Sequence, residues 1–214
     1  MEKLLNLKNS TDYQKLRYPA GIIKNGGIVV FPTETVYGIG TNGLDKEAVE
    51  RLYKIKERPL NKPISLLVSD YEMIEKVVKD INELEYKIMK KFFPGPLTII
   101  LNKKDIVPDI VTSGGSTVGI RMPEEEITRK LIEYAGVPIA APSANISGEP
   151  SGIDLQEIIK EFGDKVDYYI DGGKSKIGIG STIVKVENNS IKILREGNIS
   201  KKEIENAINN TILD

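Results

Sequence analysis

Short apolar runs alternate with amphipathic stretches along the chain. Residues 28–31 read Ile-Val-Val-Phe, a continuous apolar run that is typical of a buried strand. Residues 45–56 place their apolar side chains on one face, which predicts an amphipathic helix. The same patterns predict further strands at 64–68, 97–101, 118–121, 138–141, 167–170, 181–187 and 191–195, and helices at 81–93, 125–135 and 154–162. This alternation of strands and helices predicts an α/β fold.

Turn and cap residues mark several element ends. The Pro-Gly-Pro run at 94–96 should end the helix before it, and the Asn pair at 188–189 should join the last two strands as a hairpin. Ser69 and Ser200 are each followed three residues later by Glu, the spacing of a capping box at a helix start. No repeat, low-complexity stretch or linker interrupts the pattern. We therefore predict one domain over residues 1–214, built around a mixed sheet.

Charge and composition narrow the chemistry. Lys and Arg total 30 against 31 Asp and Glu, so any nucleic-acid binding must rest on a local basic patch. Cys is absent, which excludes disulfides, thiol nucleophiles and Cys-ligated metals. His is absent as well, which excludes an imidazole base, a Ser-His-Asp triad and His-ligated metals. We therefore expect electrostatic positioning of an already activated substrate.

The start of the chain shows no targeting signal. Within residues 1–9 a polar residue interrupts every apolar run, so a signal-peptide core is missing. No stretch of the chain approaches the ~20 apolar residues of a membrane helix. The sequence predicts a cytoplasmic protein with no membrane segment.

Two nucleotide-binding patterns occur but lack their context. Residues 38–43 match G-x-G-x-x-G, yet six residues separate them from the preceding strand and no acidic residue follows at the distance that holds a ribose. Residues 173–175 read Gly-Lys-Ser like the end of a P-loop, but Tyr168 stands where the upstream glycine is required. We predict neither a Rossmann nor a P-loop site.

Polar loops attached to the predicted elements are the stronger signal. Residues 32–38 read Pro-Thr-Glu-Thr-Val-Tyr-Gly, which as a simple turn would satisfy its own backbone groups. Residues 51–62 hold five positive side chains against one negative, and a helix C-terminus explains part of that excess. The neighbouring prolines restrict the loop that carries Lys56 and Arg58, which suits a fixed polyanion site better than a solvated face.

Other strand ends carry similar groups. Arg121 ends a predicted strand, where it could hold a carboxylate or form a surface ion pair. Residues 140–148 combine small residues, which let a ligand approach the backbone, with hydroxyl and amide groups. Glycines, hydroxyls and one Arg recur at 178–182 and 194–197. Ligands of open α/β sheets bind in crevices at such strand ends.

Seven motifs occur together and in order: Pro-Thr-Glu-Thr-Val-Tyr-Gly, Lys-x-Arg-Pro, Pro-Gly-Pro-Leu-Thr, Arg-Met-Pro, Ala-Pro-Ser-Ala-Asn-x-Ser-Gly, Ser-Thr and Leu-Arg-Glu-Gly. With them the chain resembles the YrdC-like threonylcarbamoyl-AMP synthases, over about residues 11–197 and in their short, single-domain form. The resemblance implies an open, twisted mixed α/β sheet flanked by helices, with a large concave, positively charged cavity.

The resemblance also implies an activity. It is that of a nucleotidyltransferase that converts L-threonine, bicarbonate or CO2, and ATP with Mg²⁺ into threonylcarbamoyl-adenylate and pyrophosphate. A separate transfer complex would then pass the threonylcarbamoyl group to tRNA, in threonylcarbamoyl-adenosine formation. This chemistry suits a chain without His, because threonine's amine takes up CO2 without an enzymic proton carrier.

The resemblance also implies roles for the individual residues that match the family's motifs. It implies Lys56 and Arg58 as the catalytic groups and no protein-held metal, since Mg²⁺ arrives with ATP. Leu67 and Glu125 stand where some relatives have His; other apparent synthases lack the first of these, so we expect activity here. The implied threonine ligands are Thr33, Arg121, which would hold the carboxylate, and Ser181. The implied ATP ligands are Lys56, Arg58, Asn61, Thr112, Ser143, Asn145, Ser151 and Arg195.

Two alternatives remain at the level of sequence. A paralogue could keep the cavity but bind RNA, such as tRNA or a double-stranded backbone, or act at the ribosome without synthase activity. Against it, no RNP motif is present and aromatic residues make up only 6% of the chain, so few bases could stack. A carbamoyl transferase of the hydrogenase-maturation type is the other alternative, but those proteins are longer and carry Cys motifs that this chain lacks.

Overall fold

Eleven strands pair into one sheet in the computed structural model, which describes residues 3–209. In sheet order the strands are β1 (Leu4–Asn6), β9 (Tyr168–Asp171), β2 (Val29–Phe31), β3 (Gly38–Asn42), β8 (Ile139–Ala140), β4 (Leu66–Leu67), β7 (Thr117–Arg121), β6 (Leu97–Lys103), β10 (Thr182–Glu187) and β11 (Ser190–Arg195), with β5 (Val78–Lys79) beside β6. The helices are α1 (Arg17–Lys24), α2 (Lys46–Ile55), α3 (Tyr71–Val77), α4 (Glu83–Phe92), α5 (Glu126–Ala135), α6 (Leu155–Phe162) and α7 (Lys201–Asn209), with 3-10 turns at Tyr13–Leu16 and Gly163–Lys165.

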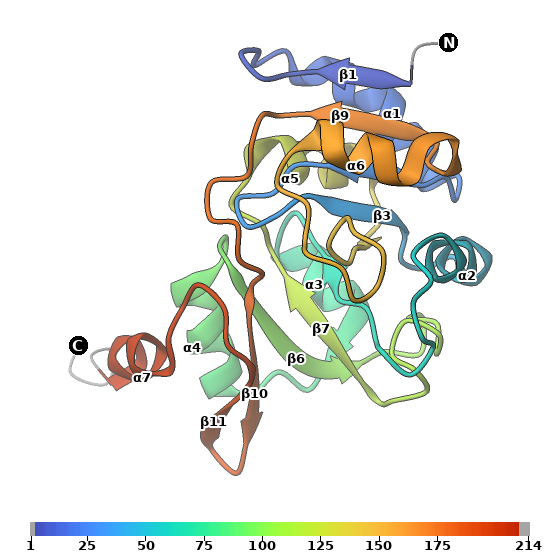
Figure 1. Ribbon diagram of the computed structural model, residues 1–214. Coiled ribbons are helices and arrows are strands. Elements are labelled where there is room, and N and C mark those ends of the chain that lie inside the picture. Colours follow the sequence, from blue (N-terminus) through green and yellow to red (C-terminus); the bar gives the residue numbers. More distant parts are fainter. Residues whose placement is uncertain (1–2, 210–214) are drawn as a thin grey trace.

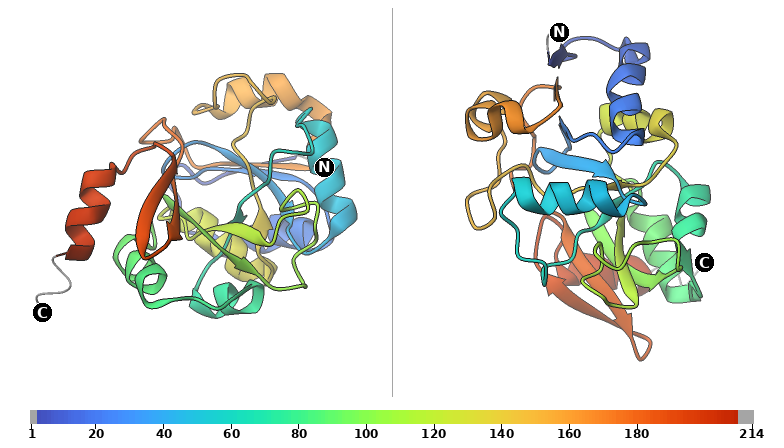
Figure 2. Two further views of the ribbon diagram at one scale, coloured as in Figure 1. Left: turned by 90° about the horizontal axis from the view of Figure 1, so that it is seen from below. Right: turned by 90° about the vertical axis from the view of Figure 1, so that its right-hand side faces the viewer.

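The sheet is mixed and open, as the sequence predicts. The sheet contains parallel pairs, such as β2 with β9 and β4 with β7, and antiparallel pairs, such as β2 with β3 and β6 with β7. In Figure 1, β1, β9 and β3 cross the upper part of the molecule, while β6, β7 and β10 run down the lower part, so the sheet is strongly twisted. In both views of Figure 2, α6 (orange) lies on one side of the sheet and α1, α4 and α5 lie on the other.

Most predicted elements are confirmed, with ends that differ by one or two residues. The second capping box is present, because Ser200 and Glu203 exchange hydrogen bonds at the start of α7. The first is wrong: Asp70 caps α3 by accepting from the Met73 amide at 2.8 Å, and the Ser69 hydroxyl donates to Asp70 instead. Ser and Asp are both favourable N-cap residues, and Asp70, which directly precedes the helix, is the one that accepts a hydrogen bond from the Met73 amide.

Among the described strands and α-helices, four were not predicted: β1, α1, β3 and β5. Residues 38–43, which match a dinucleotide-binding pattern, form β3 and its end, antiparallel to β2, so the rejection of a Rossmann site is confirmed. The glycines serve close packing, since a Cβ at Gly40 would lie 2.5 Å from the Ile139 side chain. Helix α1 was not predicted because it contains Pro19 and Gly21. Pro19 lies in the first turn of the helix, where the missing amide hydrogen costs no hydrogen bond within the helix.

Four adjacent strands, β4, β7, β6 and β10, each contribute one residue to a row that runs across the sheet. Leu67 on β4 pairs with Arg121 on β7, and Thr98 on β6 pairs with Ile183 on β10. Because Ile99 pairs with Ile120 in the antiparallel β6–β7 ladder, Thr98 lies opposite Arg121. Side chains opposite each other on neighbouring strands are about 4.5–5.5 Å apart at Cβ. This row of Leu67, Arg121, Thr98 and Ile183 forms one wall of the site described next.

Candidate functional site

A pocket of about 170 Å³ opens over the row. The guanidinium groups of Arg58, Arg121 and Arg195 line it, and no acidic side chain does. The remaining lining is small, hydroxyl-bearing or apolar: Thr35, Val36, Pro63, Ile64, Ser65, Leu67, Thr98, Ala141, Pro142, Ser143, Ser151, Gly180, Ser181 and Ile183. Three fixed positive charges and several hydroxyls make this a site for an anionic, hydrogen-bonding ligand.

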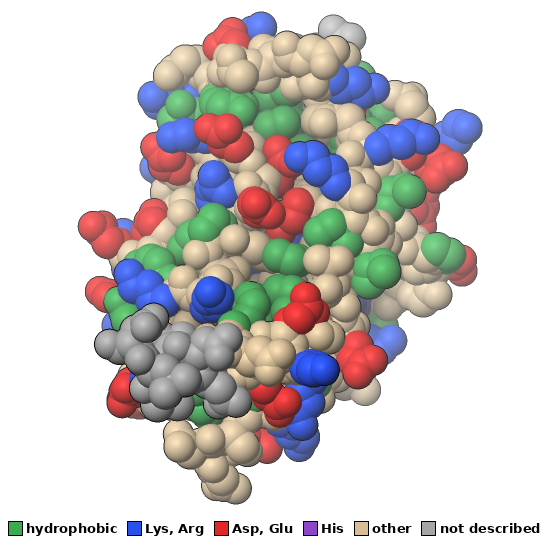
Figure 3. Space-filling model, turned by 90° about the vertical axis from the view of Figure 1, so that its left-hand side faces the viewer, with side chains coloured by type: hydrophobic (Ala, Val, Ile, Leu, Met, Phe, Trp, Pro, Cys, Tyr) green, Lys and Arg blue, Asp and Glu red, His purple; other side chains and the backbone are tan. Residues whose placement is uncertain are grey.

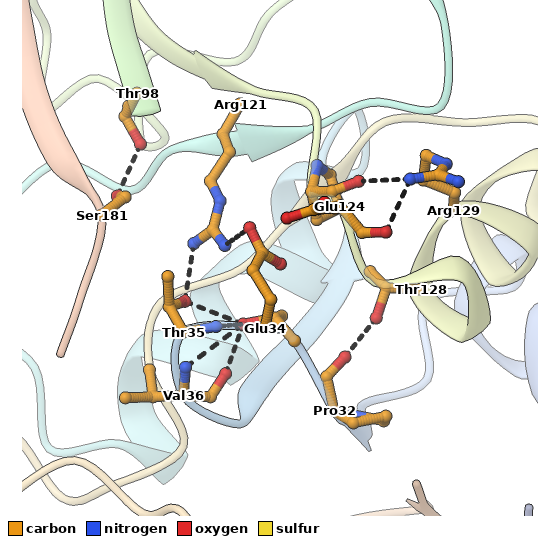
Figure 4. A network of polar contacts seen from close by, with 12 residues as sticks. Pro32, Glu34, Thr35, Val36, Thr98, Arg121, Glu124, Thr128, Arg129 and Ser181 are labelled. Carbon is orange, nitrogen blue, oxygen red and sulfur yellow. Dashed lines mark hydrogen bonds and ion pairs between the residues drawn. The ribbon is translucent and has the colours of Figure 1, made fainter. Parts of the chain in front are cut away.

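Arg121 is held rigidly at the end of β7. One terminal nitrogen donates to the Thr35 hydroxyl at 3.0 Å and the other to Glu34 Oε1 at 2.7 Å (Figure 4). Both charged side chains are buried, with 8% and 6% of their surface exposed. Within the described part of the chain, Arg121 Nε and Glu34 Oε2 have no hydrogen-bond partner. The sequence left open a carboxylate site or a surface ion pair at Arg121; the structure shows a buried ion pair in the wall of a pocket.

Arg195 and Ser181 bring β11 and β10 into the same wall. The Arg195 guanidinium donates to the Ser181 carbonyl at 2.8 and 3.1 Å and to the Ser181 hydroxyl at 3.2 Å. Burial lowers the pKa of Arg195, and the charges of Arg121 and Arg58 lower it further. The three guanidiniums therefore repel one another across the pocket, and an anion bound between them would relieve that repulsion.

Arg58 lies on the loop after α2. Its Nε donates to the Lys62 carbonyl at 2.9 Å and a terminal nitrogen donates to the Pro63 carbonyl at 2.8 Å. The side chain therefore links the two ends of the loop formed by residues 58–63. Burial lowers the pKa of this guanidinium too. A guanidinium has five donor hydrogens, so donors remain for a ligand in the pocket.

Lys56 is buried and lies outside the pocket lining. It is 1% exposed, and its ammonium donates to the Ser143 carbonyl at 2.6 Å and to the Asn145 carbonyl. Burial, with a smaller contribution from the charge of Arg58, lowers its pKa to about 7. Its own carbonyl accepts from the Ser147 amide at 3.0 Å. Lys56 thus ties the end of α2 to residues 143–147, one of the loops that borders the pocket.

Replacing this lysine should destabilise the fold. We expect Lys56→Met to lower the free energy of unfolding by about 2 kcal/mol, because two buried carbonyls lose their hydrogen-bond donor. Urea denaturation at neutral pH measures the change. Lys54→Met, on the exposed side of the same helix, is the matched control and should alter stability by less than about 0.5 kcal/mol. Equal stability of the two variants would contradict a structural role for Lys56.

The structure brings six of the predicted site residues into one pocket: Arg58, Arg121, Ser143, Ser151, Ser181 and Arg195. The other five lie outside its lining: Thr33, Lys56, Asn61, Thr112 and Asn145.

Local bonds explain most of these outer positions. The Thr33 hydroxyl is used inside its loop, with Thr35 and the Val36 carbonyl. The Thr112 hydroxyl donates to the Gly115 carbonyl at 2.8 Å. The side-chain amide of Asn145 donates to the Ile146 and Glu149 carbonyls. Asn61 is exposed.

Three lining residues with hydroxyl groups were not predicted as site residues: Thr35, Ser65 and Thr98. Thr35 and Thr98 lie in motifs visible in the sequence. Side chains alternate between the two faces of a strand, and the sequence alone does not show which face of the strand at Thr98 borders the pocket. No cluster of three or more Asp, Glu, His or Cys that could hold a metal ion exists among residues 3–209. Within the same residues no helix is long and apolar enough to cross a membrane.

A family model described as "Telomere recombination", the Sua5/YciO/YrdC model, matches residues 21–197. The chain belongs to the Sua5/YciO/YrdC family. The resemblance inferred from the seven motifs is thereby confirmed, and the twisted mixed sheet is the fold of solved members of this family.

Named members of the family are similar in sequence to this chain over most of its length. The threonylcarbamoyl-AMP synthase of Pyrococcus abyssi is 42% identical over 208 residues, which are 97% of this chain and 61% of that protein. A putative threonylcarbamoyl-AMP synthase of Methanocaldococcus jannaschii is 46% identical over 195 residues, 91% of each protein. The crystal structure of P. abyssi Sua5 complexed with L-threonine matches with a TM-score of 0.93, over 96% of this chain and 60% of that one. The chain therefore spans about three fifths of the P. abyssi relative and nearly all of the M. jannaschii one.

Proposed function

We propose that this chain is a threonylcarbamoyl-AMP synthase, a nucleotidyltransferase that uses L-threonine, bicarbonate or CO2, and ATP. The observation that carries the proposal is the convergence of Arg58, Arg121 and Arg195 on one pocket of a Sua5/YciO/YrdC chain. The reaction joins two anions, a carbamate and a triphosphate, and such a pocket offsets their repulsion. The named relatives and the threonine complex of P. abyssi Sua5 support the same reaction class.

Threonine is assigned to the Arg121 end of the pocket. Arg121 is oriented by Glu34 and Thr35, and it presents a fixed guanidinium to the amino acid's carboxylate. Thr33, predicted to bind threonine, acts in this proposal by accepting from the Thr35 amide and bonding the Thr35 hydroxyl, and so shapes the loop.

ATP is assigned to the Arg58 and Arg195 side. At about 170 Å³ the pocket is smaller than the ~300–1,000 Å³ of typical small-molecule sites, so the nucleotide must extend beyond it toward solvent. Ser143 and Ser151 line the pocket from the 140–151 segment and offer hydroxyls to the phosphates or the nucleoside. Asn61 and Thr112 fit the proposal only as ligands of the part of ATP that lies outside the pocket.

Each step balances without a histidine. The neutral amine of threonine adds to CO2, forming a C–N bond and releasing a proton to solvent. A carbamate oxygen then attacks the α-phosphorus of ATP, and the bond to pyrophosphate breaks as the new O–P bond forms. The protein supplies alignment of the two anions and positive charge for the leaving pyrophosphate, the two largest contributions to phosphoryl-type transfer. Mg²⁺ enters with ATP as part of the substrate, held by its phosphates.

The two departures from the family pattern have different weight in this structure. Leu67 lies in the pocket wall next to Arg121, so an apolar group stands where some relatives have His. Glu125 precedes α5, lies outside the pocket lining, and its side chain makes no cap hydrogen bond. Of the two positions, only Leu67 can change contacts with threonine.

We further propose that the protein acts in the cytoplasm and passes its product to a separate complex that modifies tRNA. On the face shown in Figure 3, Lys and Arg side chains are interspersed with Asp and Glu.

Pyrophosphate release tests the proposed function. The purified protein is incubated with ATP, Mg²⁺, bicarbonate and L-threonine, and each component is omitted in turn. We expect release that requires all four. Release that is independent of threonine or bicarbonate, or ATP binding without any release, would contradict the synthase assignment. Tight, steeply salt-dependent tRNA binding in place of turnover would favour the RNA-binding alternative.

A further inference from the structure

Two hydroxyl groups form a hydrogen-bonded pair in the pocket wall. Thr98 Oγ1 on β6 lies 2.8 Å from Ser181 Oγ at the start of β10, and both residues line the pocket (Figure 4). The two side chains come from positions 83 residues apart, and both residues are nearly fully buried, at 2% and 4% exposed. In the described part of the chain, Thr98 Oγ1 has no hydrogen-bond partner other than Ser181.

Counting donors shows what the pair offers to a ligand. Arg195 can only donate, so Ser181 Oγ accepts from it at 3.2 Å. The two hydroxyls carry two hydrogens, and their mutual bond uses one of them. One hydroxyl hydrogen therefore remains free in either arrangement, and Thr98 Oγ1 keeps at least one lone pair. The pair thus offers one donor and one acceptor side by side, the complement of a ligand hydroxyl.

The hydroxyl pair lines the same pocket as Arg121, whose guanidinium is the proposed carboxylate site. Continuing the β6–β7 register by one residue places Thr98 opposite Arg121 on the neighbouring strand. An α-amino acid whose carboxylate lies on Arg121 has its β-carbon two bonds from that carboxylate carbon, within reach of the next strand. Leu67 and Ile183 occupy the outer positions of the row and are apolar, so the hydroxyl that this row offers to a ligand is that of Thr98, with Ser181 bonded to it.

We propose that Thr98, with Ser181, selects amino acids that carry a β-hydroxyl, and that Thr98 is a specificity-determining residue of this enzyme. The inference rests on the proposed function and adds to it the residue that distinguishes threonine from its deoxy analogue, L-2-aminobutyrate. A site built around a substrate hydroxyl discriminates strongly, because the analogue leaves buried polar atoms unpaired. Discrimination between threonine and serine, which differ by one methyl group, falls to the apolar members of the wall and should be weaker, roughly 10–200-fold.

Thr98→Val tests the inference because it removes the hydroxyl at nearly constant volume. The ratio of kcat/KM for L-threonine to that for L-2-aminobutyrate, measured by pyrophosphate release, should fall by about tenfold, with KM for ATP unchanged. Thr98→Ser restores a hydroxyl and should restore the ratio. Calorimetric titration with L-threonine and L-2-aminobutyrate gives the same comparison without turnover.

A matched control removes a buried threonine hydroxyl elsewhere. Thr41 on β3 is fully buried and lies outside the pocket lining, so Thr41→Val should keep the wild-type ratio. Thermal unfolding of each variant shows that the chain is folded when it is assayed.

The outcomes separate this inference from the proposed function. An unchanged ratio in Thr98→Val with an active wild-type enzyme overturns the role of Thr98 and leaves the synthase assignment intact. A raised KM for ATP with an unchanged ratio also overturns it, because the pair would then bind a nucleotide hydroxyl. Wild-type protein that neither binds threonine nor releases pyrophosphate overturns the proposed function and this inference together.

Discussion

Arg58→Ala is expected to lower kcat for pyrophosphate release by roughly 10²–10³-fold, the usual loss when one fixed donor to a developing anion is removed. Arg58 lines the pocket, and its guanidinium is held by the Lys62 and Pro63 carbonyls, so it is positioned before any ligand binds. Single-turnover measurements at saturating ATP separate this loss in the chemical step from weaker binding.

Two comparisons make the Arg58 result interpretable. Lys62→Ala removes a positive charge from the same loop but leaves its carbonyl in place, and it should retain activity close to wild type. Arg58→Lys keeps the charge without the two-armed geometry and should recover only part of the rate. Pyrophosphate release by Arg58→Ala at the wild-type rate would remove Arg58 from the mechanism and weaken the synthase assignment with it.

Glu34→Ala is expected to cost about 3–5 kcal/mol of folding stability, because it leaves the buried Arg121 guanidinium without its partner. Urea denaturation gives the free energy of unfolding. Exposed Glu124, drawn beside this network in Figure 4, provides the control, since Glu124→Ala should change stability by less than about 0.5 kcal/mol.

A double-mutant cycle identifies the cause of the Glu34 effect. If the ion pair is responsible, Glu34→Ala combined with Arg121→Ala should cost less than the sum of the two single variants by more than about 1 kcal/mol, since neither charge is then left unpaired. Additive losses would show that Glu34 stabilises the loop by other means than through Arg121.

The fold class and the polar loops that border the pocket were predictable because they depend on local patterns. Continuous apolar runs such as residues 28–31 identify buried strands, and the loops at their ends carry the polar groups. The strand β3 was missed because its glycines weaken the pattern, and their role appears only when Ile139 of a distant strand packs against them. The prediction that residues 1–214 are a single domain stays a prediction.

The direction in which a side chain points was less predictable than its presence near the site. Lys56 and Arg58 are separated by one residue, yet Arg58 lines the pocket while the Lys56 ammonium is buried against carbonyls of residues 143 and 145. The sequence shows two cations in one loop; the choice between them depends on a segment almost ninety residues away, whose carbonyls complete the Lys56 site. Similarly, the two threonines of the 32–38 loop look equivalent in sequence, but Thr35 contacts Arg121 while Thr33 bonds within the loop.

The row of aligned positions across β4, β7, β6 and β10 has a practical consequence for redesign. Its members Leu67, Thr98 and Ile183 come from separate strands whose backbones are fixed by the sheet, whereas Arg58 and Ser143 come from loops. A combinatorial library limited to these three strand positions would vary one wall of the pocket and leave the loops that carry Arg58 and Ser143 untouched. Under the proposed function, such a library would be a direct route to variants that accept other amino acids.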